Sequence, residues 1–514
     1  MDQKIEPCYT CRNRRIQCDQ SGMPCAKCQK SGLECNEKRP VRWVQGVAIR
    51  GKMMGRTFSS NADNVNKKSA LIKSRRSVVN PVRPGSLNFN NFTLDSLPNL
   101  SFTLQDPSVL HLDRISRYYV DYYNERICKL FIVYDSDKNP FRSLISLGLK
   151  DPALLKALLA LAARHHVNAG QCFDQAETPT EPRLVNAHRD ALSFKHQAIE
   201  ALSLSLRDNK DLKQDTTVAS IFLLIFLDLI ESGSDGWNFH LEGAKKLIAS
   251  TYLTPESHAG VNQGPGETVQ EIREFITKQI HLIETLGSAF TRPRLLSQSS
   301  SLGLPELQHQ EIIEKSFLGC PESLLTAIRC LSVQRDSISA STPLDSAAVG
   351  LDQSDTTSLL KLIQNFNCYA WASGLQRSRG SSPQDIANLC RLSQAYKIGC
   401  LIYGGRILDA LTGAESLQDD QVLELLGVVD SLKDDPALFK CILWPIFVAG
   451  LECQLQNQRD FLMNCLERFW TLTSCLNAVN AAKTLQDHWR QSSPTARSQW
   501  IFNIGNLGRD WLWI

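Results

Sequence analysis

Six cysteines near the N-terminus have the type and spacing of zinc ligands. They follow the pattern C-x2-C-x6-C-x6-C-x2-C-x6-C over Cys8, Cys11, Cys18, Cys25, Cys28 and Cys35. A gap of two residues lets two thiolates approach one ion from a tight turn. Two tetrahedral ions need eight ligand positions, and six sulfurs supply them if two sulfurs bridge both ions. The spacing therefore predicts a cluster with two zinc ions per chain.

The segment that holds these cysteines is too short to fold on an apolar core alone, so its stability must come largely from metal. Structural zinc contributes on the order of 10–16 kcal/mol of apparent binding free energy in small domains. A metal sink, a redox thiol cluster and a disulfide knot are the alternatives. A sink would be denser in cysteine throughout. The polar N-terminus has no signal-peptide pattern, which indicates an intracellular chain in which structural disulfides are rare.

Charge is distributed unevenly along the 514 residues. The formal net charge is only +3, yet residues 1–85 carry 18 Lys and Arg against 6 Asp and Glu, and residues 86–514 carry a net −9. A basic head on an acidic body predicts a polyanionic partner for the head alone. The longest apolar stretch, 218–230, is shorter than the roughly 18–20 residues that span a bilayer and contains Asp228, so we expect no membrane partner.

The residues between the cysteines carry a family resemblance. The sequence from Cys8 to Cys35, which includes the segment CRNRRIQCD, resembles the fungal binuclear zinc cluster transcription factors. The resemblance implies that the first and fourth cysteines, Cys8 and Cys25, bridge the two ions. It also implies that a helix between Cys11 and Cys18 enters the major groove of double-stranded DNA and recognises a CGG-like triplet.

The same resemblance assigns DNA contacts to five basic residues. Bases are contacted by Arg14 and Arg15, and backbone phosphates by Arg12, Lys27 and Lys30. The chemistry agrees, because arginine presents paired donors that fit guanine O6 and N7, worth about 1–3 kcal/mol of discrimination per good pair. Lysines on phosphates add affinity and salt dependence but carry little sequence information.

Residues 41–105 have the composition of a basic, largely disordered linker between a DNA-binding domain at 1–40 and a body at 106–514. Proline, serine and asparagine dilute its apolar content, and no sustained heptad pattern indicates a coiled coil. We therefore expect any homodimer to form through the body. A split basic run in the linker is a candidate nuclear import signal and predicts a nuclear protein: Lys67, Lys68, Lys73, Arg75 and Arg76.

Helical periodicity dominates the body. Asp151 and Pro152 form an N-cap and first-turn pair, and the leucines that follow are spaced for one helix face. Apolar segments at 218–230 and 439–451 continue the pattern, and alternating strands are absent. The sequence predicts a large all-α domain with a variable loop at 332–358.

Several short patterns in the body resemble the second fungal-specific transcription factor domain, the family that includes the acriflavine-sensitivity control regulator. They occur in the order Asn139–Arg142, Asp151–Leu155, Trp237 with His240–Ala244, Gly319–Pro321 and Leu443–Gly450. The resemblance spans roughly residues 110–500. It implies a regulatory domain for dimerisation, inhibition or effector response, without catalysis.

Other candidate chemistry in the body matches no known motif. His165, His166 and His240 are expected to cap helices or to hydrogen-bond in the core, not to bind metal. The pairs Asp419-Asp420 and Asp434-Asp435 do not fit the D-D-x-x-D/E pattern of helical cyclases and are expected as helix caps or solvated charge. The eleven body cysteines are scattered, which favours buried small hydrophobes over a thiol sensor.

Three classes of function fit these observations. The leading hypothesis is a transcription regulator of RNA polymerase II genes that binds CGG-like sites. A helical enzyme with an accessory zinc module would need a carboxylate-rich cavity, and an interaction scaffold would not need arginine at base-reading positions. No H-E-x-x-H, G-x-S-x-G or phosphate-binding glycine loop occurs, so we expect no enzyme. The expected partners are double-stranded DNA, a second copy, and the transcription machinery or co-regulators.

Overall fold

Helices make up nearly all the regular structure in the computed structural model of this chain. The structure describes residues 7–19, 24–33, 35–36, 109, 111–176, 179, 181–207, 214–234, 236–253, 267–291, 313, 316–340, 346–375, 382–491, 500–506 and 509–514. Within these ranges, the strand-like pairing is an isolated bridge between Ser234 and Trp511. The prediction of an all-α body is confirmed. The predicted linker and its import signal lie outside the described residues.

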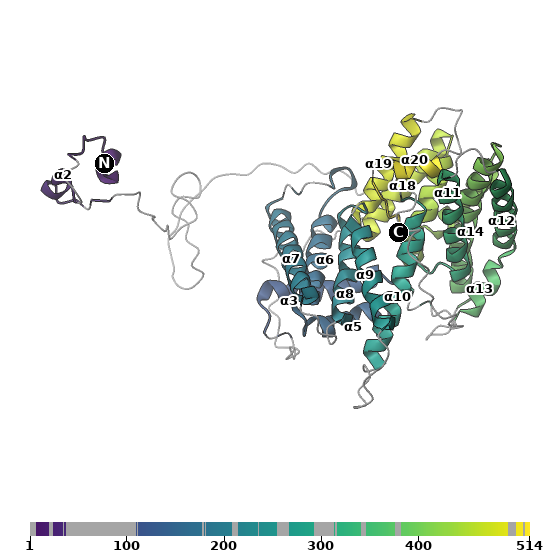
Figure 1. Cartoon of the computed structure of the whole chain (residues 1–514), viewed down its shortest axis with the longest axis horizontal. Coiled ribbons are helices and arrows are strands. Elements are labelled where there is room, and N and C mark those ends of the chain that lie inside the picture. The colour runs from purple at the N-terminus through teal and green to yellow at the C-terminus, as the bar shows by residue number, and fades with distance from the viewer. Residues whose placement is uncertain are drawn as a thin grey trace, which may run out of the picture. The chain divides into compact units, whose positions relative to one another are not determined.

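The chain divides into two units, Met1–Pro98 and Asn99–Ile514 (Figure 1). The first unit has α1 (Tyr9–Asn13) and α2 (Ala26–Lys30). The second unit has α3 (Arg114–Tyr122), η3 (Tyr123–Ile127), α4 (Cys128–Leu130), α5 (Pro140–Gly148), α6 (Pro152–Ala169), η4 (Phe173–Gln175), α7 (Pro182–Arg207), α8 (Gln214–Glu231), α9 (Gly236–Leu253) and α10 (Glu267–Ser288). It continues with α11 (Glu322–Ala340), α12 (Ser346–Asn365), α13 (Cys368–Gly374), α14 (Pro383–Thr412), α15 (Asp419–Leu432), α16 (Pro436–Phe439), α17 (Leu443–Glu452), α18 (Gln456–Thr473), α19 (Leu476–Gln491) and α20 (Trp500–Asn506).

Local sequence explains where the central helices begin and what they bury. The Asp151 carboxylate accepts from the N–H groups of Ala153 and Leu154, at 2.9 and 3.0 Å, and so caps α6 as predicted. Helix α8 is apolar on all sides through Ile221–Leu227, and each of these residues is buried, as expected for a helix at the centre of a core. No helix in the described part of the chain is long and apolar enough to cross a membrane.

The predicted variable loop at 332–358 is wrong. Helix α11 continues to Ala340 and α12 begins at Ser346. The segment is rich in serine and threonine, which lowers its helix propensity in isolation. Tertiary contacts override that preference: Thr356 is buried and its hydroxyl donates to the side chain of Gln334 at 3.0 Å, which joins the two helices.

Polar side chains tie together segments of the body that are distant in sequence. The Asn168 amide donates to the carbonyls of Ile230 and Ser474, both at 2.9 Å. Residues 510–514 are also buried: Leu512 donates its N–H to the Gly233 carbonyl at 2.8 Å, and its side chain is fully enclosed. These hydrogen bonds pair buried backbone groups of segments that are distant in sequence, as a stable core requires.

A buried ion cluster joins α14, α17 and α20. The Arg406 guanidinium donates to both carboxylate oxygens of Glu452, at 2.7 and 2.6 Å, and to Asp409 at 2.8 Å. The indole of Trp500 donates to the same Glu452 carboxylate at 2.6 Å. The three charged side chains are 6 % exposed or less. Removing the Arg406 guanidinium would leave the carboxylates of Glu452 and Asp409 buried without a counter-charge.

We expect Arg406→Met to destabilise the body by about 3–5 kcal/mol, because it leaves Glu452 and Asp409 uncompensated in the core. The midpoint of thermal unfolding, followed by the helical circular dichroism of the full chain, measures the effect. Lys433→Met is the matched control, since Lys433 pairs with Asp430 at 2.8 Å while both side chains stay about half exposed. The control should leave the midpoint unchanged. Equal losses in the two variants would contradict this account of the ion cluster.

Candidate metal centre

The two short helices of the first unit each begin on a cysteine sulfur. The Cys8 Sγ accepts from the N–H of Cys11 at 3.4 Å and caps α1. The Cys25 Sγ accepts from the N–H of Cys28 at 3.4 Å and caps α2 in the same way. Each x2 gap is thus the first turn of a helix. The sulfur satisfies an N–H group that the helix leaves unpaired.

The predicted place of the first helix, between Cys11 and Cys18, is wrong. Helix α1 begins before Cys11 and ends at Asn13. The sulfur cap fixes the beginning, and a turn in the left-handed conformation at Arg15, with φ at +55°, fixes the end. Arg14 and Arg15 therefore lie just after the helix and not within it.

The two halves of the unit turn in matching ways. The N–H of Ile16 donates to the carbonyl of Cys11 and the N–H of Leu33 to that of Cys28, both at 3.0 Å. The left-handed residue is Arg15 in the first half and Gly32, with φ at +61°, in the second. Glycine adopts this conformation freely, whereas a residue with a side chain meets a cost of about 1–2 kcal/mol. The first half keeps an arginine where the backbone favours glycine.

The six sulfurs form two groups that share two members. The ligand atoms lie within 4.8 Å of one another in each group: Cys8, Cys11, Cys18 and Cys25 in one, and Cys8, Cys25, Cys28 and Cys35 in the other. The Cys8 Sγ is 3.8 Å from that of Cys25, and the Cys11 Sγ is 3.7 Å from that of Cys25. A zinc tetrahedron with Zn–S bonds of about 2.3 Å has S–S edges of about 3.8 Å. The donor set and its spacing fit zinc.

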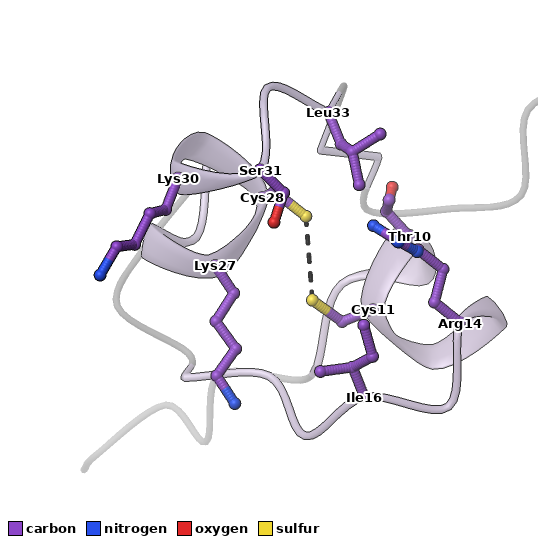
Figure 2. Close-up of a pocket in the computed structure, with 9 residues that line it drawn as sticks. All are labelled: Thr10, Cys11, Arg14, Ile16, Lys27, Cys28, Lys30, Ser31 and Leu33. Carbon is purple, nitrogen blue, oxygen red and sulfur yellow. Dashed lines mark hydrogen bonds between the residues drawn. The ribbon is translucent and has the colours of Figure 1, made fainter.

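One distance between the groups is shorter than two bound ions would give. The Sγ atoms of Cys11 and Cys28 are 3.8 Å apart (Figure 2). Two tetrahedra that share an edge would hold these sulfurs about 5 Å apart. With two ions bound, Cys11 and Cys28 would therefore lie farther apart than they do here.

Burial also sets the protonation of the cysteines while no metal is bound, and it favours the neutral thiol at Cys11 and Cys28. Burial raises the pKa of Cys11 to about 12, and it raises the pKa of Cys28 as well. The N–H of Cys11 lowers the pKa of Cys8 instead. Enclosed thiols become thiolates when a metal ion stabilises their charge, so metal binding releases protons and weakens as the pH falls.

The five basic residues of the predicted DNA contacts are all exposed: Arg12, Arg14, Arg15, Lys27 and Lys30. The Lys27 ammonium group donates to the Gln17 carbonyl at 2.6 Å and so joins α2 to the loop after α1. Lys30 points outward from α2 (Figure 2). Arg14 lines a hollow between the two helices together with Ile16 and Leu33.

Three further hydrogen bonds hold the halves of the unit together, and the sequence did not predict them. The Asp19 carboxylate accepts from the N–H of Ala26 at 3.0 Å. Asn36 closes the segment, since its carbonyl accepts from the N–H of Tyr9 at 2.7 Å and its N–H donates to the Thr10 hydroxyl at 3.1 Å. Each hydrogen bond joins residues seven or more positions apart, so no local sequence pattern predicts it.

His165, His240 and Asp435, three of the other candidate residues of the body, have structural partners, whereas Asp419, Asp420 and Asp434 are exposed. His165 hydrogen-bonds with the Tyr122 hydroxyl at 2.8 Å, and burial lowers its pKa to about 4. His240 pairs with Asp228 at 2.7 Å. Asp435 caps α16. Among the described residues, the two cysteine groups are the sets of His, Cys, Asp and Glu that could hold a metal ion.

Comparison with known proteins matches both parts of the chain. The model of the fungal specific transcription factor domain matches residues 117–513, and that of the fungal Zn(2)-Cys(6) binuclear cluster domain matches residues 6–43. The acriflavine sensitivity control protein acr-2 of Neurospora crassa is 26% identical over 426 residues, which cover 80% of this chain and 68% of that protein. No solved structure gives a significant match.

We expect Cys25→Ser to abolish binding of both zinc ions, because Cys25 belongs to both sulfur groups. Cys35→Ser should retain about one ion per chain, since the group of Cys8, Cys11, Cys18 and Cys25 stays complete. Zinc content of the purified full chain, measured by elemental analysis, checks both values. Cys172→Ser, at an exposed cysteine of the body, is the control and should keep the full zinc content. If the Cys25 and Cys35 variants lost the same amount, the shared position of Cys25 would be disproved.

Proposed function

Because the chain belongs to the family of the fungal specific transcription factor domain, we propose that it recognises a DNA sequence and thereby regulates RNA polymerase II genes. It is a transcription regulator and not an enzyme, since the matching families are those of transcription factors. Its binuclear cluster domain binds two zinc ions. When bound, zinc supplies positive charge and tetrahedral geometry to the cysteines.

The proposed zinc ligands are Cys8, Cys11, Cys18, Cys25, Cys28 and Cys35. Cys8 and Cys25 are the proposed bridges, because each lies in both sulfur groups. These two sulfurs also cap α1 and α2. Metal binding and helix formation thus use the same atoms, and the unit would lose its two helices together with its metal.

The proposed base contacts are made by Arg14 and Arg15 to the guanines of a CGG-like triplet. The observation that carries this proposal is the left-handed backbone of Arg15, at the position that glycine occupies in the second half. A side chain kept at a conformational cost is typical of a functional position. Both arginines are exposed next to the end of α1, and paired guanidinium donors suit guanine in the major groove.

The proposed phosphate contacts are made by Arg12, Lys27 and Lys30. All three are exposed on or beside the short helices. The ammonium group of Lys27 is held against the Gln17 carbonyl, so its charge has a fixed place in the unit. Contacts of this kind set the position of a protein on the duplex and the salt dependence of its binding.

The remaining assignments concern the rest of the chain. We assign residues 1–40 to the DNA-binding domain, 41–105 to a linker and 106–514 to the regulatory body, which would pair two copies and contact the transcription machinery or co-regulators. Action on DNA requires a nuclear protein, and Lys67, Lys68, Lys73, Arg75 and Arg76 are the proposed import signal. The described body offers a helical surface for these contacts, and His165, His240 and Asp435 are engaged in structural bonds.

We expect Arg15→Gly to lose at least tenfold in affinity for a CGG-containing duplex while it keeps its zinc. One lost guanine contact corresponds to about 1–3 kcal/mol. The glycine relieves the positive-φ backbone, so the unit should resist chelation as well as the wild type or better. Fluorescence anisotropy with matched and scrambled duplexes, beside a zinc assay, measures both properties.

Lys30→Ala provides the contrast for this experiment. Loss of a phosphate contact should weaken binding to matched and scrambled duplexes equally. It should also reduce the slope of log affinity against log salt concentration by about one. Arg15→Gly should instead reduce the difference between the affinities for the matched and the scrambled duplex. Unchanged discrimination in Arg15→Gly would overturn the base-reading assignment.

A further inference from the structure

Helix α7 has two apolar faces, and the body covers one of them. The inner face packs against α6 and the core through Leu184, Ala187, Ala191, Phe194, Ala198 and Leu202, which are all buried. A second row, called the outer stripe, is left in contact with solvent. Its exposed fractions are 38% for Val185, 51% for Leu192, 44% for Ile199 and 49% for Leu206. Figure 1 shows α7 at an edge of the body, beside α6.

The outer stripe has a repeat of seven residues. Seven residues complete two helical turns to within about 20°, so the four side chains form a row that winds slowly around the helix. A second helix follows such a row along its whole length when the two helices cross at about 20°. A flat or globular surface would meet only part of it. The spacing therefore specifies a helical partner.

We propose that the outer stripe pairs with the outer stripe of a second copy of this chain, with the two α7 helices antiparallel. In the register that sets Leu192 against Ile199 of the second copy, Val185 faces Leu206 of the second copy, so all four side chains find an apolar partner. The charged residues of the exposed face between these ends are Arg189 and Glu200. In this register they lie level with uncharged residues. In a parallel pair in register, Arg189 would face Arg189 of the second copy and Glu200 would face Glu200, so that like charges would repel.

The size of the outer stripe predicts a weak dimer. From Val185 to Leu206 the helix rises about 32 Å, and a helix offers a contact strip about 10 Å wide. The strip covers about 300 Å² per copy, against about 800 Å² in a standard stable interface. We expect association only at high protein concentration. Two copies bound to neighbouring DNA sites would meet at a far higher effective concentration, a use that rests on the proposed DNA-binding function.

Sedimentation velocity of the full chain without DNA tests the pairing. The wild type should shift from one-chain to two-chain mass as its concentration is raised. Leu192→Glu and Ile199→Lys should each raise the dissociation constant of the dimer at least tenfold. A one-to-one mixture of these two variants should recover the dimer, because antiparallel helices set residue 192 of one copy against residue 199 of the other.

Leu204→Glu is the matched control on the same helix. Leu204 is 57% exposed but lies about 140° around the helix from Ile199, so this change should leave the dimer intact. The antiparallel register would be overturned if a mixture of Leu192→Glu with Leu192→Lys recovered the dimer and the mixture of Leu192→Glu with Ile199→Lys did not. A wild type that stays one chain throughout, or variants that dimerise like the wild type, would overturn the interface. Binding of each variant to a duplex with a single triplet is measured separately, so failure of the DNA proposal would appear there alone.

Discussion

Coordination of cysteine sulfur by zinc is the interaction on which the N-terminal unit depends. In the described part of that unit the buried residues are four cysteines, and no aliphatic side chain is buried with them. Too little apolar surface is covered to offset the loss of chain entropy, so the metal must supply the difference. The same sulfurs begin α1 and α2, and the turn after α1 holds Arg14 and Arg15. The place of these two arginines, the proposed DNA-reading residues, is therefore set by the metal site.

The body is stabilised by a different physical principle, the burial of apolar surface around helices that have no exposed face. Helix α8 is enclosed through its middle, and the residues after α20 pack their tryptophans against the core. Charges inside this core, such as Arg406, are compensated by neighbouring carboxylates. The two units thus respond to different perturbations, metal loss in one and core disruption in the other. What the body leaves uncovered on α7 is an ordered row of apolar residues, which suits association better than catalysis.

Sequence patterns predicted those parts of the molecule that depend on local chemistry. The cysteine spacing indicated the cluster, and Asp151 with Pro152 marked the beginning of α6. The same patterns misplaced the first short helix, because sulfur is an uncommon cap and the turn at Arg15 needs a conformation that arginine seldom adopts. They also missed the helices within 332–358, which depend on tertiary contacts such as that of Thr356. The seven-residue spacing of the outer stripe on α7 is present in the sequence, but the exposure of these residues depends on which face of α7 packs against α6.

Selection of sites from random double-stranded DNA by the full-length, zinc-loaded protein tests the central claim most directly. The account predicts that the enriched sequences share a CGG-like triplet and that the same protein after zinc chelation enriches none of them, because the metal holds the reading arginines in place. Enrichment of sequences without such a triplet would contradict the base-reading assignment. Undiminished enrichment after chelation would contradict the claim that zinc positions the DNA-reading residues.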